Sequence, residues 1–256
     1  MSLDEKLLLD ELARIVNHAE RRGAILRGLG ATAIRSHSLS FAEKCPAIRR
    51  DLTDLDLIAY SKDGQRVMES FKECGYHQDR ARAYIATVVG RTILENPDVH
   101  LIIDLFFDRL SYNHTLDLKG RLEQDPLTIP LADLFLEKTQ IVQVNEKDVK
   151  DCVLLLGEHS IGEGDKEIVN VSRISKILSG DWGFYYTVST NMQKIADYAK
   201  TFQGLAEDDR IDILSKIQQL RNAIEAYPKS FAWKMRARVG TGKKWYDDVE
   251  ELYAGH

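Results

Sequence analysis

The stretch LTDLDLIAY, residues 52–60, places Asp54 and Asp56 one residue apart inside an apolar segment. Side chains alternate along a strand, so residues two apart share a face. Apart from the two aspartates both faces are largely apolar, which predicts a central strand covered on both sides. Burying an unpaired carboxylate costs several kcal/mol or shifts its pKa until it is neutral. The pair therefore requires a cation or water beside it.

A third carboxylate, Asp104, lies in the second apolar segment HLIIDLFF. Acids from two adjacent strands can meet at one place and bind Mg²⁺ (or Mn²⁺), which takes one or two carboxylates together with substrate phosphates. Such ions serve phosphoryl transfer from a nucleoside triphosphate. The alternative is that the aspartates only cap turns at strand ends. Asp108 is a second candidate for the third ligand, but Ile102, Asp104 and Phe106 share one strand face, which favours Asp104.

Periodicity and turn residues predict an α+β chain, with a small mixed sheet and flanking helices followed by a helical C-terminal domain. Domain boundaries of 1–125 and 126–256 follow from this change of pattern. The first helix is expected to begin at Ser2, residues 39–51 are expected to form a loop, and Asn145 and Gly157 are expected to bound a later helix. The remaining expected elements are a strand at 24–28 entering a glycine turn, helices at 31–37, 64–76 and 127–143, a hairpin at 92–107, and an almost wholly helical region from about 165.

Three segments together carry a family resemblance. GLGATAIRSH (28–37), RDLTDLDLIAY (50–60) and HLIIDLFFD (100–108) resemble the nucleotidyltransferase fold that includes DNA polymerase beta. That family has a small glycine turn, a helix, a D-x-D strand and a third carboxylate on a later strand. The segment PLADLFLEKTQIVQVNEKDVKD (130–151) is similar to the abortive-infection, AbiEii-like branch. The resemblance covers about residues 24–157.

The resemblance implies catalytic and metal-binding roles for Asp54, Asp56 and Asp104, with Asp104 also acting as base toward the acceptor. It implies that Lys138 neutralises phosphate charge and that Asp148 orients this lysine or the base. The residues implied to bind the nucleotide are Gly28, Gly30, Ala31, Arg50, Lys138 and Asp148.

Lys138 has a structural alternative. Its neighbours three and four residues away on the expected helix are Phe135, Ile141, Leu134 and Val142, so no acid on that helix can pair with it. The alternative interpretation is that Lys138 is a lone solvated charge on the helix surface. The histidines at positions 37, 77, 100 and 114 show no mutual ligand spacing, and His37 draws interest only because it follows the glycine turn.

Composition limits the environment and the partners. The 256 residues carry a formal net charge of −5 and three scattered cysteines, which predicts reduced thiols in a cytoplasmic protein. No apolar run approaches the ~18–20 residues of a membrane span. The segment 229–246 holds six basic residues without an acid, interleaved with aromatic residues, which suits an RNA partner. Its alternative is a helix whose aromatic residues pack on the domain.

The leading functional hypothesis is metal-dependent transfer of a nucleoside monophosphate from a nucleoside triphosphate to a hydroxyl. The acceptor can be RNA, in its sharpest form tRNA modified by a toxin-like enzyme, or a small molecule such as an aminoglycoside. The second hypothesis is a catalytically inactive module of the same fold that binds nucleotide, RNA or protein; Ala31, where the family usually has Gly or Ser, supports it. The third is one half of a toxin–antitoxin pair with an antitoxin partner.

Overall fold

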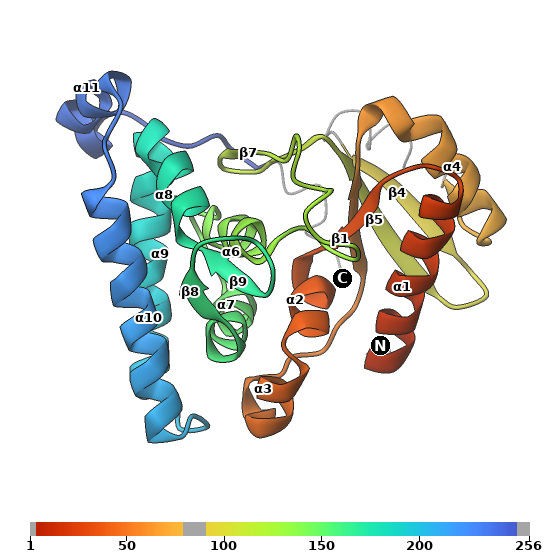
Figure 1. Ribbon diagram of the computed structural model, residues 1–256, viewed down its shortest axis with the longest axis horizontal. Helices are drawn as coiled ribbons and strands as arrows, with labels where there is room; N and C mark the ends of the chain where they lie inside the picture. Colours follow the sequence, from red (N-terminus) through yellow and green to blue (C-terminus); the bar gives the residue numbers. More distant parts are fainter. Residues whose placement is uncertain (1–3, 79–90, 250–256) are drawn as a thin grey trace.

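The computed structural model describes residues 4–78 and 91–249 and has a mixed α+β architecture (Figure 1). Its main sheet has five strands in the order β1-β2-β5-β4-β3. β2 and β5 are parallel, and the other neighbouring pairs are antiparallel. The strands are β1 (Leu26–Leu29), β2 (Leu55–Ala59), β3 (His77–Gln78), β4 (Arg91–Asn96) and β5 (Leu101–Phe107). The predicted strand around 54–60 and the predicted hairpin are thereby confirmed.

One face of this sheet is covered by α1 (Glu5–Arg21) and α4 (Gly64–Glu73), as Figure 1 shows. Leu8 and Leu12 of α1 and Phe71 of α4 are fully or almost fully buried against Leu57 and Leu105 of the central strands. The expected N-cap Ser2 lies outside the described residues. α1 is capped by Asp4, whose side chain accepts a hydrogen bond from the backbone nitrogen of Lys6.

The other face is covered by α2 (Gly30–His37) and by the helices that follow the sheet. Ile58 and Phe106 of the sheet belong to the same hydrophobic cluster as Phe135 and Ile217 of these helices. A continuous core thus joins the sheet to the helical half, and the boundary at 125/126 stays a prediction. The later helices are α6 (Leu131–Thr139), α7 (Glu146–Glu158), α8 (Val171–Gly180), α9 (Trp182–Thr201), α10 (Glu207–Ala226) and α11 (Phe231–Val239).

Two local expectations are wrong, and they concern segments that pack against each other. The expected loop at 39–51 contains α3 (Leu39–Lys44) and the 3₁₀ helix η1 (Pro46–Ile48). Phe41 of α3 is buried, and a Cβ added at Gly157 would lie 2.4 Å from its ring. Gly157 therefore allows α3 to pack closely on α7 and does not end α7, which continues to Glu158.

Several short elements were not predicted from the sequence. The two-stranded sheets pair β6 (Arg109–Ser111) with β7 (Thr115–Asp117) and β8 (Ser160–Gly162) with β9 (Ile168–Asn170), and two more 3₁₀ helices are η2 (Ser61–Asp63) and η3 (Gly240–Gly242).

Asn145 caps α7 as expected, accepting from the backbone nitrogen of Asp148. All three cysteines are free and buried. In the parts of the chain that the structure describes, no helix combines the length and apolarity that crossing a membrane demands.

Candidate active site

Asp56 and Asp104 lie side by side on adjacent strands, and Asp54 precedes Asp56 by two residues; these three residues are called the carboxylate row below. Asp56 of β2 is in register with Leu29 of β1 on one side and with Asp104 of β5 on the other. Asp54 lies immediately before β2, and its backbone oxygen accepts a hydrogen bond from the Thr32 hydroxyl of α2 at 3.1 Å. Because strands in a sheet are about 4.8 Å apart, the row brings the first residue of α2 and two acids together at the same level of the sheet.

Gly30 makes the close approach of α2 to this row possible. It has a φ of +73°, and a Cβ built on it would lie 2.3 Å from Oδ2 of Asp56. Any side chain here would have to displace the carboxylate, and an L-residue would also be strained by the left-handed backbone. The glycine turn recognised in the sequence is therefore required to seat Asp56.

Asp56 carries the electrostatic signature of crowded negative charge. Burial raises its pKa well above the ordinary value, and the carboxylates of Asp54, Glu137 and Asp104 raise it further. Lys138 opposes this effect only in part. Like charges within a few Å of each other disfavour the ionised form unless a cation compensates them.

Glu137, which was not among the predicted site residues, belongs to the carboxylates that surround Asp56. It lies on α6, it is 6% exposed, and its Oε2 accepts a hydrogen bond from the backbone nitrogen of Gly30 at 3.0 Å. Burial raises the pKa of Glu137 to about 7, although Lys138 and the Gly30 N–H favour its ionised form. The sequence held no local signal for this residue, because Asp133 and Glu137 are spaced as one polar helix face, whereas in the structure every residue of α6 is buried.

Lys138 is buried, so the interpretation as a solvated surface charge is wrong. Its Nζ lies 3.0 Å from Oδ1 of Asp148 and 3.2 Å from Oδ2 of Asp151, both on α7. Burial lowers the pKa of this lysine, but the carboxylates of Asp151, Glu137 and Asp148 raise it above its usual range. The prediction that α6 itself supplies no partner is compatible with this, because the partners come from the next helix.

Arg50 joins the same network from the segment before β2. Its Nε and Nη2 contact the two carboxylate oxygens of Asp151 at 3.1 and 3.0 Å, a bidentate pair. Asp151 thus holds a guanidinium and an ammonium group at once. The ion pairs with Asp151 hold Arg50 and Lys138 against α7.

Asp104 has a partner that the sequence analysis did not anticipate. Its Oδ2 lies 2.9 Å from Nη1 of Arg91, on the adjacent strand β4. A cation that bound Asp104 would share this carboxylate with Arg91 or displace it. Asp108, the other candidate, follows the end of β5 as expected, and its Oδ1 accepts from the backbone nitrogen of Ser61.

Gly28 and Ala31 lie beside the row without facing it. A Cβ at Gly28 would meet Leu12 of α1 at 2.8 Å, and its backbone nitrogen and oxygen bond to Leu127 and Ile129. Ala31 is 7% exposed and belongs to the cluster under α1. Packing therefore explains both residues, and the structure does not bring them to the carboxylates.

The row is rich in oxygen donors, but among the described residues no three of its carboxylates bring one oxygen each within 4.8 Å of one another, so a cation would have to draw them together. Six carboxylates interact here, namely Asp54, Asp56, Asp104, Glu137, Asp148 and Asp151, and the basic groups that contact them are Arg50, Arg91 and Lys138. Among the described residues, carboxyl groups therefore outnumber these basic groups, and the raised pKa values of Asp56 and Glu137 reflect this crowding. Oxygen ligands in excess of local cations are what Mg²⁺ or Mn²⁺ requires.

The basic and aromatic segment 229–246 lies on the helical half, at the end of α9 and α10 where Figure 1 shows α11. Trp233 contacts Tyr185, and Trp245 contacts Tyr186 and donates from Nε1 to Thr187, so these aromatic residues pack on the domain as the alternative predicted. By contrast, α11 itself has no buried residue, and Phe231 is 79% exposed.

In comparisons with known proteins, no family model, no curated protein and no solved structure matches this chain.

Proposed function

We propose that this chain is a metal-dependent nucleotidyltransferase of the nucleotidyltransferase fold, in its AbiEii-like branch. The observation that carries the proposal is the row of Asp54, Asp56 and Asp104, with Gly30 in a left-handed conformation against Asp56. The resemblance in sequence supplies the reaction type, and the excess of carboxylates at the row supports a cation-dependent one.

In the proposed reaction an acceptor hydroxyl oxygen attacks the α-phosphorus of a nucleoside triphosphate. A new P–O bond forms, the bond to the bridging oxygen of the β-phosphate breaks, and pyrophosphate leaves. Asp104 takes the hydroxyl proton. Asp54, Asp56 and Asp104 would hold Mg²⁺ or Mn²⁺, which when bound compensates phosphate charge as it develops.

The basic groups of the site have roles that follow from their positions. Lys138 and Arg50 are held by Asp148 and Asp151 beside the row, and they would balance the charge of the triphosphate. Their fixed geometry matters because phosphoryl transfer depends on positioning and on electrostatic stabilisation. Lys138 is protonated throughout the physiological range, since the surrounding acids raise its pKa despite burial.

We propose RNA as the acceptor. Phe231 is exposed on α11, and Lys234, Arg238 and Lys243 are exposed in the same segment 229–246, which offers a stacking group together with cations. A toxin-like enzyme that modifies tRNA, with a separate antitoxin, remains the most specific form of the proposal, and an aminoglycoside acceptor is its rival.

The test is incubation of the protein with each labelled nucleoside triphosphate and total cellular RNA, followed by measurement of acid-precipitable label. We expect label that depends on Mg²⁺ and falls at least ~100-fold in the variant Asp54→Asn/Asp56→Asn, because the ligands of the cation are lost. Asp108→Asn is the matched control: it changes the same side chain beyond the end of β5 and keeps an oxygen for Ser61. Label that is unchanged in the double variant would refute the proposal.

A non-catalytic module of the same fold is the second candidate, and the ion pair of Arg91 with Asp104 favours it, because this guanidinium compensates the third carboxylate without a metal. Calorimetric titration of each nucleoside triphosphate separates the two. Binding that needs Mg²⁺ and is abolished by Asp54→Asn/Asp56→Asn supports the enzyme, whereas binding that is independent of the metal supports the module.

A further inference from the structure

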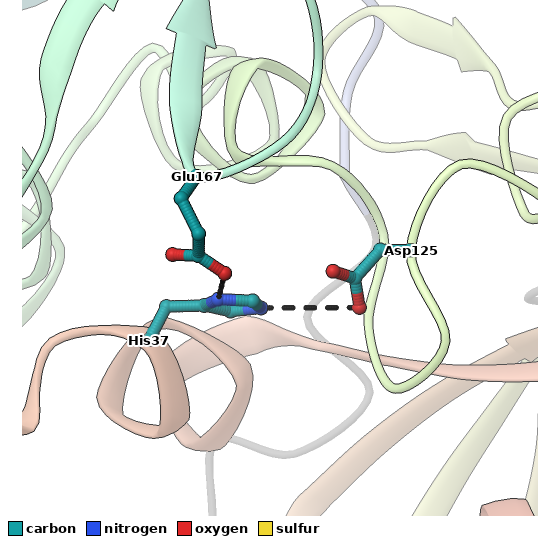
Figure 2. Close-up of side chains that lie close together, drawn as sticks. All are labelled: His37, Asp125 and Glu167. Carbon is teal, nitrogen blue, oxygen red and sulfur yellow. Dashed lines mark hydrogen bonds and ion pairs between the residues drawn. The ribbon is translucent and has the colours of Figure 1, made fainter.

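A second group of possible metal ligands lies away from the carboxylate row, where three distant segments meet (Figure 2). His37 is the last residue of α2, Asp125 lies in the segment between β7 and α6, and Glu167 comes immediately before β9. One ligand atom from each of these residues can be chosen so that all three lie within 4.8 Å of one another.

Figure 2 shows the imidazole of His37 between the two carboxylates. Its Nδ1 lies 2.9 Å from Oε1 of Glu167, and its Nε2 lies 4.0 Å from Oδ1 of Asp125. The Thr128 hydroxyl contacts the same Nε2 at 2.7 Å. Both ring nitrogens therefore face oxygen atoms, and a ligand that binds the ring meets donors already gathered around it.

These separations suit a small transition-metal ion. Zn²⁺ binds nitrogen and carboxylate oxygen at about 2.0–2.2 Å, which places tetrahedral ligands about 3.4 Å apart. The 2.9 Å and 4.0 Å distances start from different ring nitrogens, of which an ion binds only one, and the three ligand atoms of one site lie within 4.8 Å of one another, so they must draw closer together to bind Zn²⁺. The side chain of Glu167 is 54% exposed and has space to rotate, whereas His37 is 11% exposed and is held in place at the end of its helix. Closing the site therefore requires movement mainly of one surface side chain.

A neighbouring histidine gives an independent reason to assign a ligand to this site. His159 is 5% exposed, and its Nδ1 lies 3.5 Å from the second oxygen of Glu167. Its Nε2 is buried without a hydrogen-bond partner within the described ranges of 4–78 and 91–249. A buried polar side chain beside a metal-ligating carboxylate is how proteins orient such ligands.

We propose that His37, Asp125 and Glu167 bind a divalent transition-metal ion such as Zn²⁺. The imidazole sets the preference: Mg²⁺ takes oxygen ligands, whereas mixed imidazole and carboxylate sites suit zinc and its neighbours. This site is separate from the row of Asp54, Asp56 and Asp104, and it does not depend on the reaction proposed above. Because Asp125 and His37 come from the sheet half and Glu167 from the segment before β9, the ion would tie the two halves together.

The test is calorimetric titration of chelator-treated full-length protein with Zn²⁺ alone. We expect one zinc equivalent to bind and the affinity to fall at least ~100-fold in His37→Ala, since loss of orienting groups around a metal already costs 10–100-fold. Glu167→Gln should weaken zinc binding by at least ~10-fold. This variant keeps its volume, and because the side chain is half exposed it leaves the fold intact, which circular dichroism checks.

Two matched controls make the result specific. His77→Ala removes an exposed histidine on β3 and should leave zinc affinity within about twofold. Asp54→Asn/Asp56→Asn keeps the shapes of both side chains and should also leave zinc affinity unchanged when Mg²⁺ is absent, so that failure of this proposal and failure of the proposed function give different results. The assignment is overturned if the parent protein binds no zinc, or if His37→Ala and Glu167→Gln both bind zinc as tightly as the parent protein does.

Discussion

Glu137 gives the sharpest test of the electrostatics at the carboxylate row. Its pKa is raised from 4.5 to about 7, with burial as the main cause. The difference of about 2.5 units corresponds to about 3 kcal/mol, at 1.36 kcal/mol per unit. The change to examine is Glu137→Gln, which keeps the size of the side chain and keeps an oxygen to accept from the Gly30 nitrogen.

The direction in which stability changes with pH depends on whether the folded or the unfolded state holds the proton. Between pH 4.5 and 7 the folded protein keeps Glu137 protonated while the unfolded chain has lost the proton, so stability falls as pH rises through this window. Above about pH 7 the full penalty of a buried carboxylate applies. Glutamine is neutral at every pH and avoids this penalty. We therefore expect Glu137→Gln to be about 3 kcal/mol more stable than the parent protein at pH 8 and nearly equal to it at pH 4.5.

The assay is urea denaturation of both proteins at a series of pH values in metal-free buffer with a chelator. Glu43→Gln, on the exposed surface of α3, is the control, and its stability should follow that of the parent protein at each pH. If Glu137→Gln is less stable than the parent at pH 8, the ionised carboxylate is required by its neighbours and the reasoning is refuted.

Two further substitutions probe the same region by urea denaturation. Gly30→Ala should lower the free energy of unfolding by about 2–5 kcal/mol, of which about 1–2 comes from the left-handed backbone and about 1–3 from displacing Asp56. Gly120→Ala is the control, because Gly120 has φ +70° with nothing within 4 Å of an added Cβ, and it should show only the backbone cost. Equal costs would mean that Asp56 does not lie against Gly30. Lys138→Met should cost about 3–5 kcal/mol because it leaves Asp148 and Asp151 with too little positive charge. Lys200→Met, which removes an exposed pair with Asp197, should cost at most about 0.5 kcal/mol; a similar small loss in both variants would contradict the buried network.

Local signals were sufficient to predict the elements that carry the row. Alternation placed Asp54 and Asp56 on one face of a strand, and the turn at 96–98 predicted the hairpin of β4 and β5 that brings Asp104 beside them. Asn145 was recognised as the cap of α7 because capping depends on residues close in sequence. The same local rules failed at Gly157, where a packing contact from a distant helix, and not a turn, requires the glycine.

Contacts between residues far apart in sequence could not be predicted in this way. Arg50 and Asp151 are 101 positions apart, and His37 and Glu167 are 130 apart. Spacing rules for metal ligands examine neighbours along one helix or strand, so they found no site for His37. The pairing of Arg91 with Asp104 depends on the register of β4 against β5, which the hairpin pattern alone does not fix.

Helix α2 connects the two proposed metal sites. Gly30 begins this helix against Asp56, and His37 ends it between Asp125 and Glu167. The two residues are seven positions apart, which is about 10 Å along the axis at 1.5 Å per residue. A rigid helix of this length transmits displacement of one end to the other. The donor chemistry of the two sites differs, with carboxylate oxygens alone at the row and an imidazole at the other end, so each site can be titrated with its own ion. If zinc fixes the His37 end of α2, it restricts the position of Gly30 and with it the seat of Asp56. Binding of Zn²⁺ should then change the affinity for Mg²⁺, and reciprocity requires Mg²⁺ to change the affinity for Zn²⁺ by the same factor.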